Sequence, residues 1–165
     1  RVDERSDGLG PAVVFVAILL LALAVRLAGL TGESLDGDEV FTLQVATAPT
    51  ISEALSLVAA DLVHPPLYYL VARATVAFIG SSDLALRLPS LIFGLLSIAL
   101  IGPLGRRLGA PSIVAPLAAT LVALHHWHIF YSQQARSYAL FCLLTMLLLL
   151  WAVQVGRDPG RARWR

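Results

Sequence analysis

Four apolar runs, each about as long as a bilayer is thick, constrain this chain more than any other feature. A helix needs about 20 apolar residues to cross a ~30 Å hydrocarbon layer. The runs cover residues 12–30, 86–104, 112–130 and 138–155. Hydrophobic residues make up 58% of the 165-residue chain. We therefore predict an all-α, polytopic membrane protein with about four transmembrane helices, and we exclude a soluble domain.

A fifth apolar run, residues 67–79, is shorter than a spanning helix. If it crossed the membrane, Arg106–Arg107 and the basic tail at 157–165 would both lie outside, against the positive-inside rule. If it lies along the surface, both clusters are cytoplasmic. We therefore predict an outer loop over residues 31–85 that holds short interfacial helices. The protein is expected to be a multi-pass protein of the cell inner (plasma) membrane with its active face extracytoplasmic.

The loop that follows the first run is acidic as far as His64. It contains no Lys or Arg before that residue, and its carboxylates are Glu33, Asp36, Asp38, Glu39, Glu53 and Asp61. On the predicted topology, this loop shares one membrane face with His64, Arg87 and Arg136. Such a group of side chains suits an anionic substrate and an acid–base step, so we predict a reaction site there. Arg26, about one turn from the outer end of the first run, is expected to snorkel toward water.

Asp38 and Glu39 follow a chain break at residues 35–37 and begin a helical pattern. As caps, these carboxylates would favour the positive amino-terminal end of the helix dipole. A carboxylate at the membrane surface can also act as a general base. The two interpretations are compatible, and Asp38 and Glu39 are our candidate catalytic residues.

The HPPLYY string at residues 64–69 is more specific than the acidic pair. Tandem prolines fix an extended entry and fit the first turn of a helix. Interfacial anchoring is the expected task of Tyr68 and its neighbour, and Tyr68 is a further site candidate. His64 lies at a rigid turn that faces the acidic loop, which favours a role in binding.

Polar residues over 131–138 interrupt two apolar runs and include Arg136. An arginine at a helix end often snorkels. Here Tyr131 and Gln134 add hydrogen-bonding capacity at the same level, and a guanidinium can hold a phosphate through two parallel hydrogen bonds. We predict that Arg136 binds a phosphate. Arg87 either acts similarly or marks the start of its helix.

Neither a metal site nor a nucleic-acid partner is predicted. His125, His126 and His128 do not all share a helical face, because facing neighbours are three or four residues apart. Asp61 and His64 could hold a divalent ion, but two ligands are too few to predict a metal site, and the cofactor stays open. The basic and acidic residues are separated onto opposite sides of the membrane and form no single basic face, so we expect no nucleic acid to bind.

Four strings together resemble one family. They are SLDGDEVFTL at 34–43, HPPLYYLVAR at 64–73, ALRLPSLIFGLL at 85–96 and FYSQQARSYAL at 130–140. They are similar to the amino-terminal part of the polyprenyl-phosphate-sugar glycosyltransferases. These are multi-spanning enzymes of the GT-C fold, related to protein O-mannosyltransferases and to lipid A aminoarabinose transferases. The resemblance covers roughly residues 13–151.

This resemblance implies transfer of a sugar from a polyprenyl-phosphate donor to an acceptor hydroxyl at the extracytoplasmic face, with inversion. An acidic residue of the first outer loop, here Asp38 with Glu39 beside it, would deprotonate the hydroxyl. His64, Arg87 and Arg136 would contact the donor phosphate. The implied partners are a polyprenyl-phosphate-linked sugar, an acceptor that is a protein, a lipid or a glycan, and the lipid bilayer.

Two alternatives stay open. A transporter or flippase portion would line its path with ionisable residues near mid-helix. A non-catalytic family member would serve as a scaffold. The family implies more spanning helices and often a carboxy-terminal domain, so we expect residues 1–165 to be the amino-terminal part of a longer transferase and to be inactive alone.

Overall fold

The computed structural model of the chain describes residues 10–61 and 64–157. Most of these residues lie in helices, and neither range contains a strand. The predicted all-α class is therefore confirmed. The helices are α1 (Gly10–Gly29), α2 (Gly37–Thr47), α3 (Ile51–Asp61), α4 (Pro66–Ile79), α5 (Asp83–Ala99), α6 (Ile101–Leu108), α7 (Val114–Leu124), α8 (His126–Gln133) and α9 (Tyr138–Arg157).

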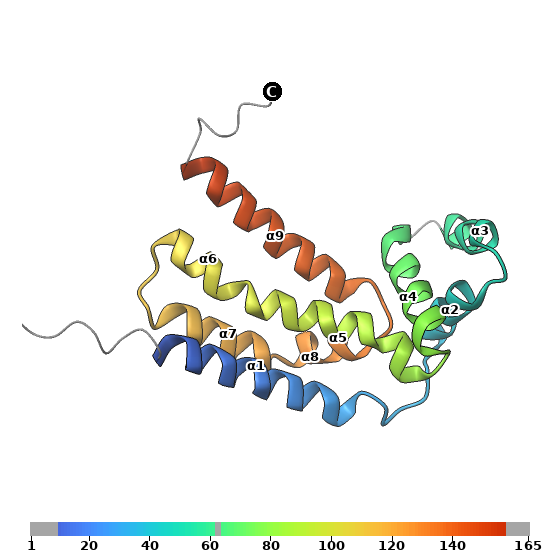
Figure 1. Cartoon of the computed structure of the whole chain (residues 1–165), viewed down its shortest axis with the longest axis horizontal. Helices are drawn as coiled ribbons and strands as arrows, with labels where there is room; N and C mark the ends of the chain where they lie inside the picture. The colour runs from blue at the N-terminus through green and yellow to red at the C-terminus, as the bar shows by residue number, and fades with distance from the viewer. Residues whose placement is uncertain (1–9, 62–63, 158–165) are drawn as a thin grey trace, which may run out of the picture.

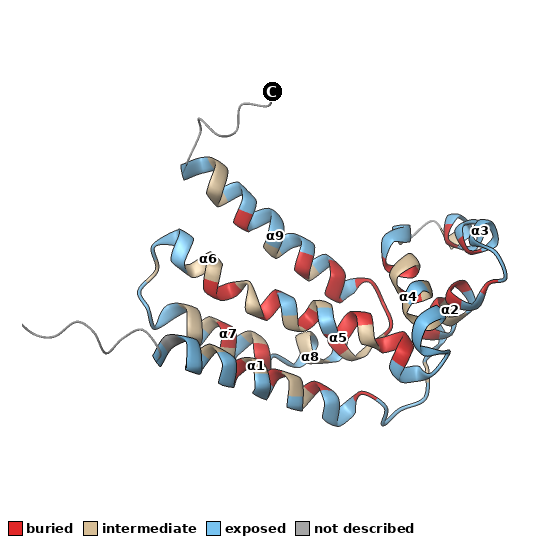
Figure 2. Ribbon diagram, viewed as in Figure 1, coloured by how far each residue is buried: buried red, intermediate tan, exposed pale blue. Residues whose placement is uncertain are grey.

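The helices form a bundle of long rods with shorter helices at one end (Figure 1). The rods are α1, α5 with α6, α7 with α8, and α9, while α2, α3 and α4 form what we call the cap. In the described part of the chain, the segments long and apolar enough to cross a membrane are Ala12–Gly29, Asp83–Leu108 and Tyr138–Arg157. The middle one is the central rod, because 56% of it is buried, against 17% and 22% for the other two (Figure 2). The outer faces of α1 and α9 are therefore left to contact lipid.

The third predicted span, residues 112–130, is not one helix. α7 ends at Leu124, His125 is extended with ψ 123°, and α8 begins at His126. With 11 and 8 residues, neither piece alone reaches the length that a bilayer requires. The described residues thus contain three long apolar helices and one broken rod, where the sequence predicted four continuous helices.

Arg26 explains why the break in this rod is tolerated. A broken helix leaves backbone carbonyls that need donors in an apolar environment. The Arg26 Nη1 donates to the carbonyls of Ala22 (2.9 Å) and Ala123 (3.0 Å), and its Nη2 lies 2.8 Å from Nδ1 of His128. Arg26 is 0% exposed. The expected snorkelling is wrong, because acceptors inside the bundle hold the guanidinium.

The two ends of the bundle carry different charge. Arg106 and Arg107 lie in the last turn of α6 and Arg157 in the last turn of α9. These turns lie at the end of the bundle away from the cap (Figure 1). The acidic residues of the predicted outer loop belong to the cap and its connections. The arginine clusters and the carboxylates are therefore separated by the length of the rods.

α4 belongs to the cap and joins it to the central rod. It begins after Pro65 with Pro66 at its first position, where a proline costs no helical hydrogen bond. Nη1 of Arg73 donates to the carbonyl of Ala48 at 2.6 Å, just beyond the end of α2. α4 also packs against α5. The short run at 67–79 therefore holds the cap together and is not one of the long rods.

α5 and α8 approach each other closely at Gly94. A Cβ atom at this position would lie 2.8 Å from Cβ of Ser132 and would overlap the Ser132 hydroxyl. Ser132 is 1% exposed, and its hydroxyl donates to the carbonyl of His128 at 2.6 Å. The side chain therefore has little room to move aside, and glycine at 94 sets the distance between the two helices.

Replacing Gly94 with alanine should destabilise the bundle. We expect Gly94→Ala to cost about 1–3 kcal/mol, the usual range for overpacking, and to lower the melting temperature of the full-length protein in detergent. Gly156→Ala in α9 is the matched control, because a Cβ there meets no atom within 4 Å. Equal melting temperatures for the two variants would contradict this account of the α5–α8 contact.

Candidate functional site

Asp38, Asp61, His64 and Arg136 meet at the cap end of the bundle, and we call them the acid–arginine cluster. Oδ2 of Asp38 lies 3.4 Å from Nη2 of Arg136. Nε2 of His64 lies 3.4 Å from the same Arg136 nitrogen, and His64 Nδ1 lies 3.0 Å from Oδ2 of Asp61. Four of the predicted site residues are thus brought together from α2, the end of α3, the entry to α4 and the entry to α9.

Exposure differs sharply within the acid–arginine cluster. The Asp38 side chain is 65% exposed, whereas the Arg136 side chain is 7% exposed. Nη1 of Arg136 also donates to the carbonyl of Asp38 (3.3 Å) and to the hydroxyl of Tyr69 (3.5 Å). The guanidinium is therefore fixed from several sides, and the carboxylate of Asp38 is free to meet a molecule from outside.

Glu39 occupies a different environment from Asp38. It is 1% exposed, and its Oε1 accepts from Nε of Arg87 (2.8 Å) and from the backbone N–H of Ala135 (2.7 Å). Oε2 accepts from Nη2 of Arg87 at 2.6 Å and from the N–H of Asp36 at 3.3 Å. Asp36 in turn accepts from the N–H of Glu39 and completes a capping box at the start of α2. The predicted role of a helix-capping carboxylate therefore describes Glu39, whose two oxygens both accept hydrogen bonds from protein donors.

The ionised form of Glu39 is favoured by this environment. Burial alone would raise the pKa of the carboxyl, but the hydrogen bonds from Arg87 and from Ala135 outweigh it and hold the pKa below its ordinary value of 4.5. A buried carboxylate that remains ionised beside a guanidinium supports the fold, and it is poorly placed to take a proton from a substrate.

Arg87 belongs to the same buried ion pair, which we call the Glu39–Arg87 lock. Besides its two bonds to Glu39, Nη1 donates to the carbonyls of Leu30 (2.7 Å) and Glu33 (3.1 Å). Nη2 also lies 3.5 Å from the carbonyl of Ser34. Arg87 is 4% exposed. Its donors are directed at protein acceptors, so the predicted phosphate contact would require the Glu39–Arg87 pair to open, whereas Nε of Arg136 has no hydrogen-bond partner among the described residues.

Tyr68 and Tyr69 are buried and do not anchor the protein at an interface. The Tyr68 hydroxyl lies 2.7 Å from Oγ of Ser90, which donates to the carbonyl of Arg136. Burial raises the pKa of Tyr68 well above its ordinary value, so it stays a neutral hydrogen-bonding group. Tyr69 is the side chain that touches Arg136. The sequence placed both tyrosines beside His64, but it gave no signal that separates their tasks.

Gln134 and Tyr131 flank the acid–arginine cluster without joining it. Nε2 of Gln134 donates to Oδ2 of Asp36 at 2.9 Å and ties the entry of α9 to the start of α2. The Tyr131 ring lies 4.5 Å from that of Tyr138, and Tyr138 lies 6.4 Å from the His64 ring. Tyr131 also lines a cavity of about 200 Å³ between α8 and α9. Both residues therefore support the surroundings of the site.

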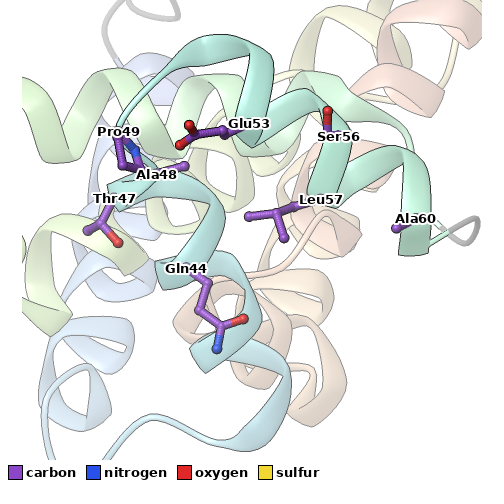
Figure 3. Close-up of a pocket in the computed structure, with 8 residues that line it drawn as sticks. All are labelled: Gln44, Thr47, Ala48, Pro49, Glu53, Ser56, Leu57 and Ala60. Carbon is purple, nitrogen blue, oxygen red and sulfur yellow. The ribbon is translucent and has the colours of Figure 1, made fainter.

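A larger groove of about 580 Å³ lies between α2 and α3 (Figure 3). Its lining combines apolar residues with the side chains of Gln44, Thr47, Glu53 and Ser56. Both hydroxyls donate within their own helices, Thr47 to the carbonyl of Leu43 and Ser56 to that of Ser52. None of the predicted site residues lines this groove.

No group of three or more His, Cys, Asp or Glu side chains is arranged to hold a metal ion within residues 10–61 and 64–157. The Asp61–His64 pair supplies two possible ligands, and the Arg136 guanidinium lies beside the second nitrogen of His64. A cation next to this nitrogen repels a second cation. The pair is therefore better suited to orient Arg136 than to bind a divalent ion.

The pH dependence of stability should reveal the Glu39–Arg87 lock. Because the pKa of Glu39 is lower in the folded than in the unfolded protein, its contribution to stability is full above about pH 4.5. It is lost as the pH falls through the folded value. We expect Glu39→Gln to lower the melting temperature of the full-length protein at about pH 7, and to flatten its decline at acid pH. Glu33→Gln, an exposed acid in the same loop, is the control; identical melting curves for both variants would refute the lock.

Comparison with known proteins adds one finding. A family model described as dolichyl-phosphate-mannose-protein mannosyltransferase matches residues 63–164, which include His64, Arg87 and Arg136. The acidic pair Asp38–Glu39 and Asp61 precede the matched region. No curated protein matches the chain, and no solved structure matches it. Because the match covers more than half of its residues, the chain belongs to the dolichyl-phosphate-mannose-protein mannosyltransferase family.

Proposed function

We propose that the full-length protein transfers a sugar from a polyprenyl-phosphate donor to an acceptor hydroxyl at the extracytoplasmic membrane face, with inversion. The family implies glycosyl transfer from polyprenyl-phosphate sugars. The observation that carries the proposal is the exposed carboxylate of Asp38, with its Oδ2 3.4 Å from the buried guanidinium of Arg136. A base that solvent can reach lies beside a fixed cation, as this reaction requires.

Asp38 acts as the general base in this scheme. It takes the proton of the acceptor hydroxyl while the hydroxyl oxygen forms its bond to the anomeric carbon. The bond between that carbon and the phosphate oxygen breaks, and its electron pair leaves with the phosphate. Attack in line with the leaving group inverts the anomeric carbon. The phosphodiester of the donor thereby becomes a phosphomonoester and gains negative charge.

Arg136 is the proposed partner of this developing charge. A guanidinium held at low dielectric stabilises an anion more strongly than it would in water. Nε of Arg136 is buried and has no hydrogen-bond partner among the described residues, and a buried donor left unpaired costs free energy. A phosphate oxygen would satisfy it. His64, which contacts Arg136, lies where it can orient this guanidinium.

Glu39 and Arg87 are positioning residues in this proposal. Their ion pair fixes the first turn of α2, in which Asp38 lies. Adjacent residues of a helix point about 100° apart, so burial of Glu39 leaves Asp38 directed outward. The site therefore uses one carboxylate for structure and its neighbour for chemistry.

The distribution of arginines supports an extracytoplasmic site. Arg106, Arg107 and Arg157 lie at the end of the bundle away from the cap, and arginines beside spanning helices favour the cytoplasmic side. The acid–arginine cluster would then face the opposite side of the inner (plasma) membrane. The donor lipid stays in the bilayer while its sugar reaches the cap.

A transport function receives less support. A translocation path needs ionisable side chains that a substrate can reach near mid-helix. Arg26 and His128 lie inside the rods, but they contact each other, and Arg26 also donates to the carbonyl of Ala22 in its own helix and to that of Ala123 beside the break. These contacts explain the pair as part of the packing.

Asp38→Asn in the full-length protein tests the proposal. Loss of a general base typically costs about 10²–10⁴-fold in rate, and we expect a loss of that size in the transfer of labelled sugar from polyprenyl-phosphate donors in membranes. Glu33→Gln should transfer at the wild-type rate. Wild-type transfer by Asp38→Asn would show that Asp38 is not the general base. Failure of the wild-type protein to use any polyprenyl-phosphate sugar would contradict the donor assignment.

A cysteine at Ser81 tests the membrane side. Ser81 is exposed at the turn between α4 and α5, at the cap end. In the full-length protein with Cys142→Ser and any other cysteine replaced, Ser81→Cys should react with an impermeant thiol reagent added outside intact cells. Ser112→Cys, exposed at the opposite end, should react only after permeabilisation. The reverse pattern would overturn the proposed orientation.

A further inference from the structure

His64 lies between a carboxylate and a guanidinium, and this position determines which of its nitrogens carries the proton. Nδ1 lies 3.0 Å from Oδ2 of Asp61, and Nε2 lies 3.4 Å from Nη2 of Arg136. An ionised carboxylate only accepts hydrogen bonds, and a guanidinium only donates them. The contacts are therefore both satisfied by one neutral tautomer, with the proton on Nδ1 and the lone pair on Nε2.

The Asp61–His64 contact differs from an ordinary ion pair on a protein surface. The His64 side chain is 10% exposed and that of Asp61 is 24% exposed. Exposed pairs pay for holding two mobile side chains in place and stabilise little. Here the imidazole is also enclosed by the rings of Tyr69 and Tyr138, each with its centroid 6.4 Å away. The imidazole is thus flanked by two aromatic rings that lie nearly perpendicular to it, and it has a partner at each nitrogen.

Arg136 is the group that this arrangement serves. One of its terminal nitrogens contacts both the Asp38 carboxylate and the His64 lone pair, and the other donates to the Asp38 carbonyl and the Tyr69 hydroxyl. If the His64 proton moved to Nε2, a donor would face the guanidinium and repel it. The orientation of Arg136 relative to Asp38 therefore depends on the tautomer of His64.

We propose that Asp61 is a positioning residue that fixes the Nδ1–H tautomer of His64 and, through it, the orientation of Arg136 beside Asp38. The proposal rests on the proposed function, because the effect on catalysis requires Asp38 and Arg136 to act on the donor. Asp61 itself touches neither Arg136 nor the reacting atoms in this scheme. Asp61 contributes a single hydrogen bond, which favours the Nδ1–H tautomer of the imidazole over the Nε2–H tautomer.

Nitrogen NMR of the full-length protein labelled with ¹⁵N-histidine tests the tautomer without any reaction. The His64 signals are assigned by their loss in His64→Gln. We expect protonated Nδ1 and unprotonated Nε2 in the wild type and in Asp61→Asn, whose amide oxygen accepts the same hydrogen bond. Asp61→Ala should give a mixture of tautomers. A proton on Nε2 in the wild type, or one unchanged tautomer in Asp61→Ala, would overturn the proposal.

Kinetics of sugar transfer then test its consequence. Misplacement of a catalytic group by about 1 Å can cost on the order of 10²-fold. We expect Asp61→Ala to lower kcat to that extent, with KM for the polyprenyl-phosphate sugar close to the wild-type value and with an unchanged melting temperature. Asp61→Asn should restore kcat, and Glu33→Ala should match the wild type. Equal loss in Asp61→Ala and Asp61→Asn would refute positioning through the tautomer.

The two proposals can fail separately. If Asp38→Asn leaves transfer unchanged while the NMR signals follow the expected pattern, the geometry of the Asp61–His64 pair stands and the catalytic scheme falls. If Asp38→Asn abolishes transfer while Asp61→Ala keeps full kcat, the catalytic scheme stands and Asp61 has no positioning role.

Discussion

The buried ion pair between Glu39 and Arg87 is the interaction on which the site depends. It joins α2 of the cap to α5 of the central rod, and its remaining hydrogen bonds reach the loop after α1 and the backbone of Ala135. Removing one partner of such a pair leaves an uncompensated buried charge, which costs about 3–5 kcal/mol. Three parts of the chain that are distant in sequence, residues 30–39, the start of α5 and the segment before α9, are therefore fixed relative to one another by two side chains.

The acid–arginine cluster follows from that lock. Glu39 accepts the N–H of Ala135, so Arg136 is placed directly beside the first turn of α2, where Asp38 lies. Thr42, one turn further along α2, donates to the carbonyl of Ala135 at 2.8 Å and repeats the attachment. The contact between Asp38 and Arg136 is thus set by buried neighbours, while the carboxylate of Asp38 itself remains accessible.

The sequence predicted which residues would meet, but it did not predict that Glu39 and Arg87 are buried and paired with each other. The positive-inside rule assigns arginine clusters beside spanning helices to the cytoplasmic side. Applied to this sequence, it predicted that Asp38, His64 and Arg136 lie together at the other end of the bundle. It could not tell Asp38 from Glu39, since neighbouring acids differ only in the direction that the helix gives them. Arg87 and Arg136 were likewise equivalent in the sequence. Both are buried beside a carboxylate, and they differ in that Glu39, the partner of Arg87, is buried, whereas Asp38, the partner of Arg136, is exposed.

The break at His125 was also hidden in the sequence. Residues 112–124 are largely apolar, and His125, His126 and His128 lie at the break, but no proline or glycine marks the position where α7 ends. The acceptor that this break exposes is satisfied by Arg26, 97 positions away, and a contact of that range leaves no local pattern. By contrast, the start of α4 was readable, because Pro65 and Pro66 restrict the backbone wherever they occur.

The most direct test of this account is a structure of the full-length protein with a bound polyprenyl phosphate, determined by electron cryomicroscopy. The account predicts that the phosphate contacts Arg136 beside the exposed carboxylate of Asp38, with Glu39 and Arg87 still paired. A phosphate bound to Arg87 with Glu39 displaced, or bound at the end of the rods that carries Arg106 and Arg107, would contradict it.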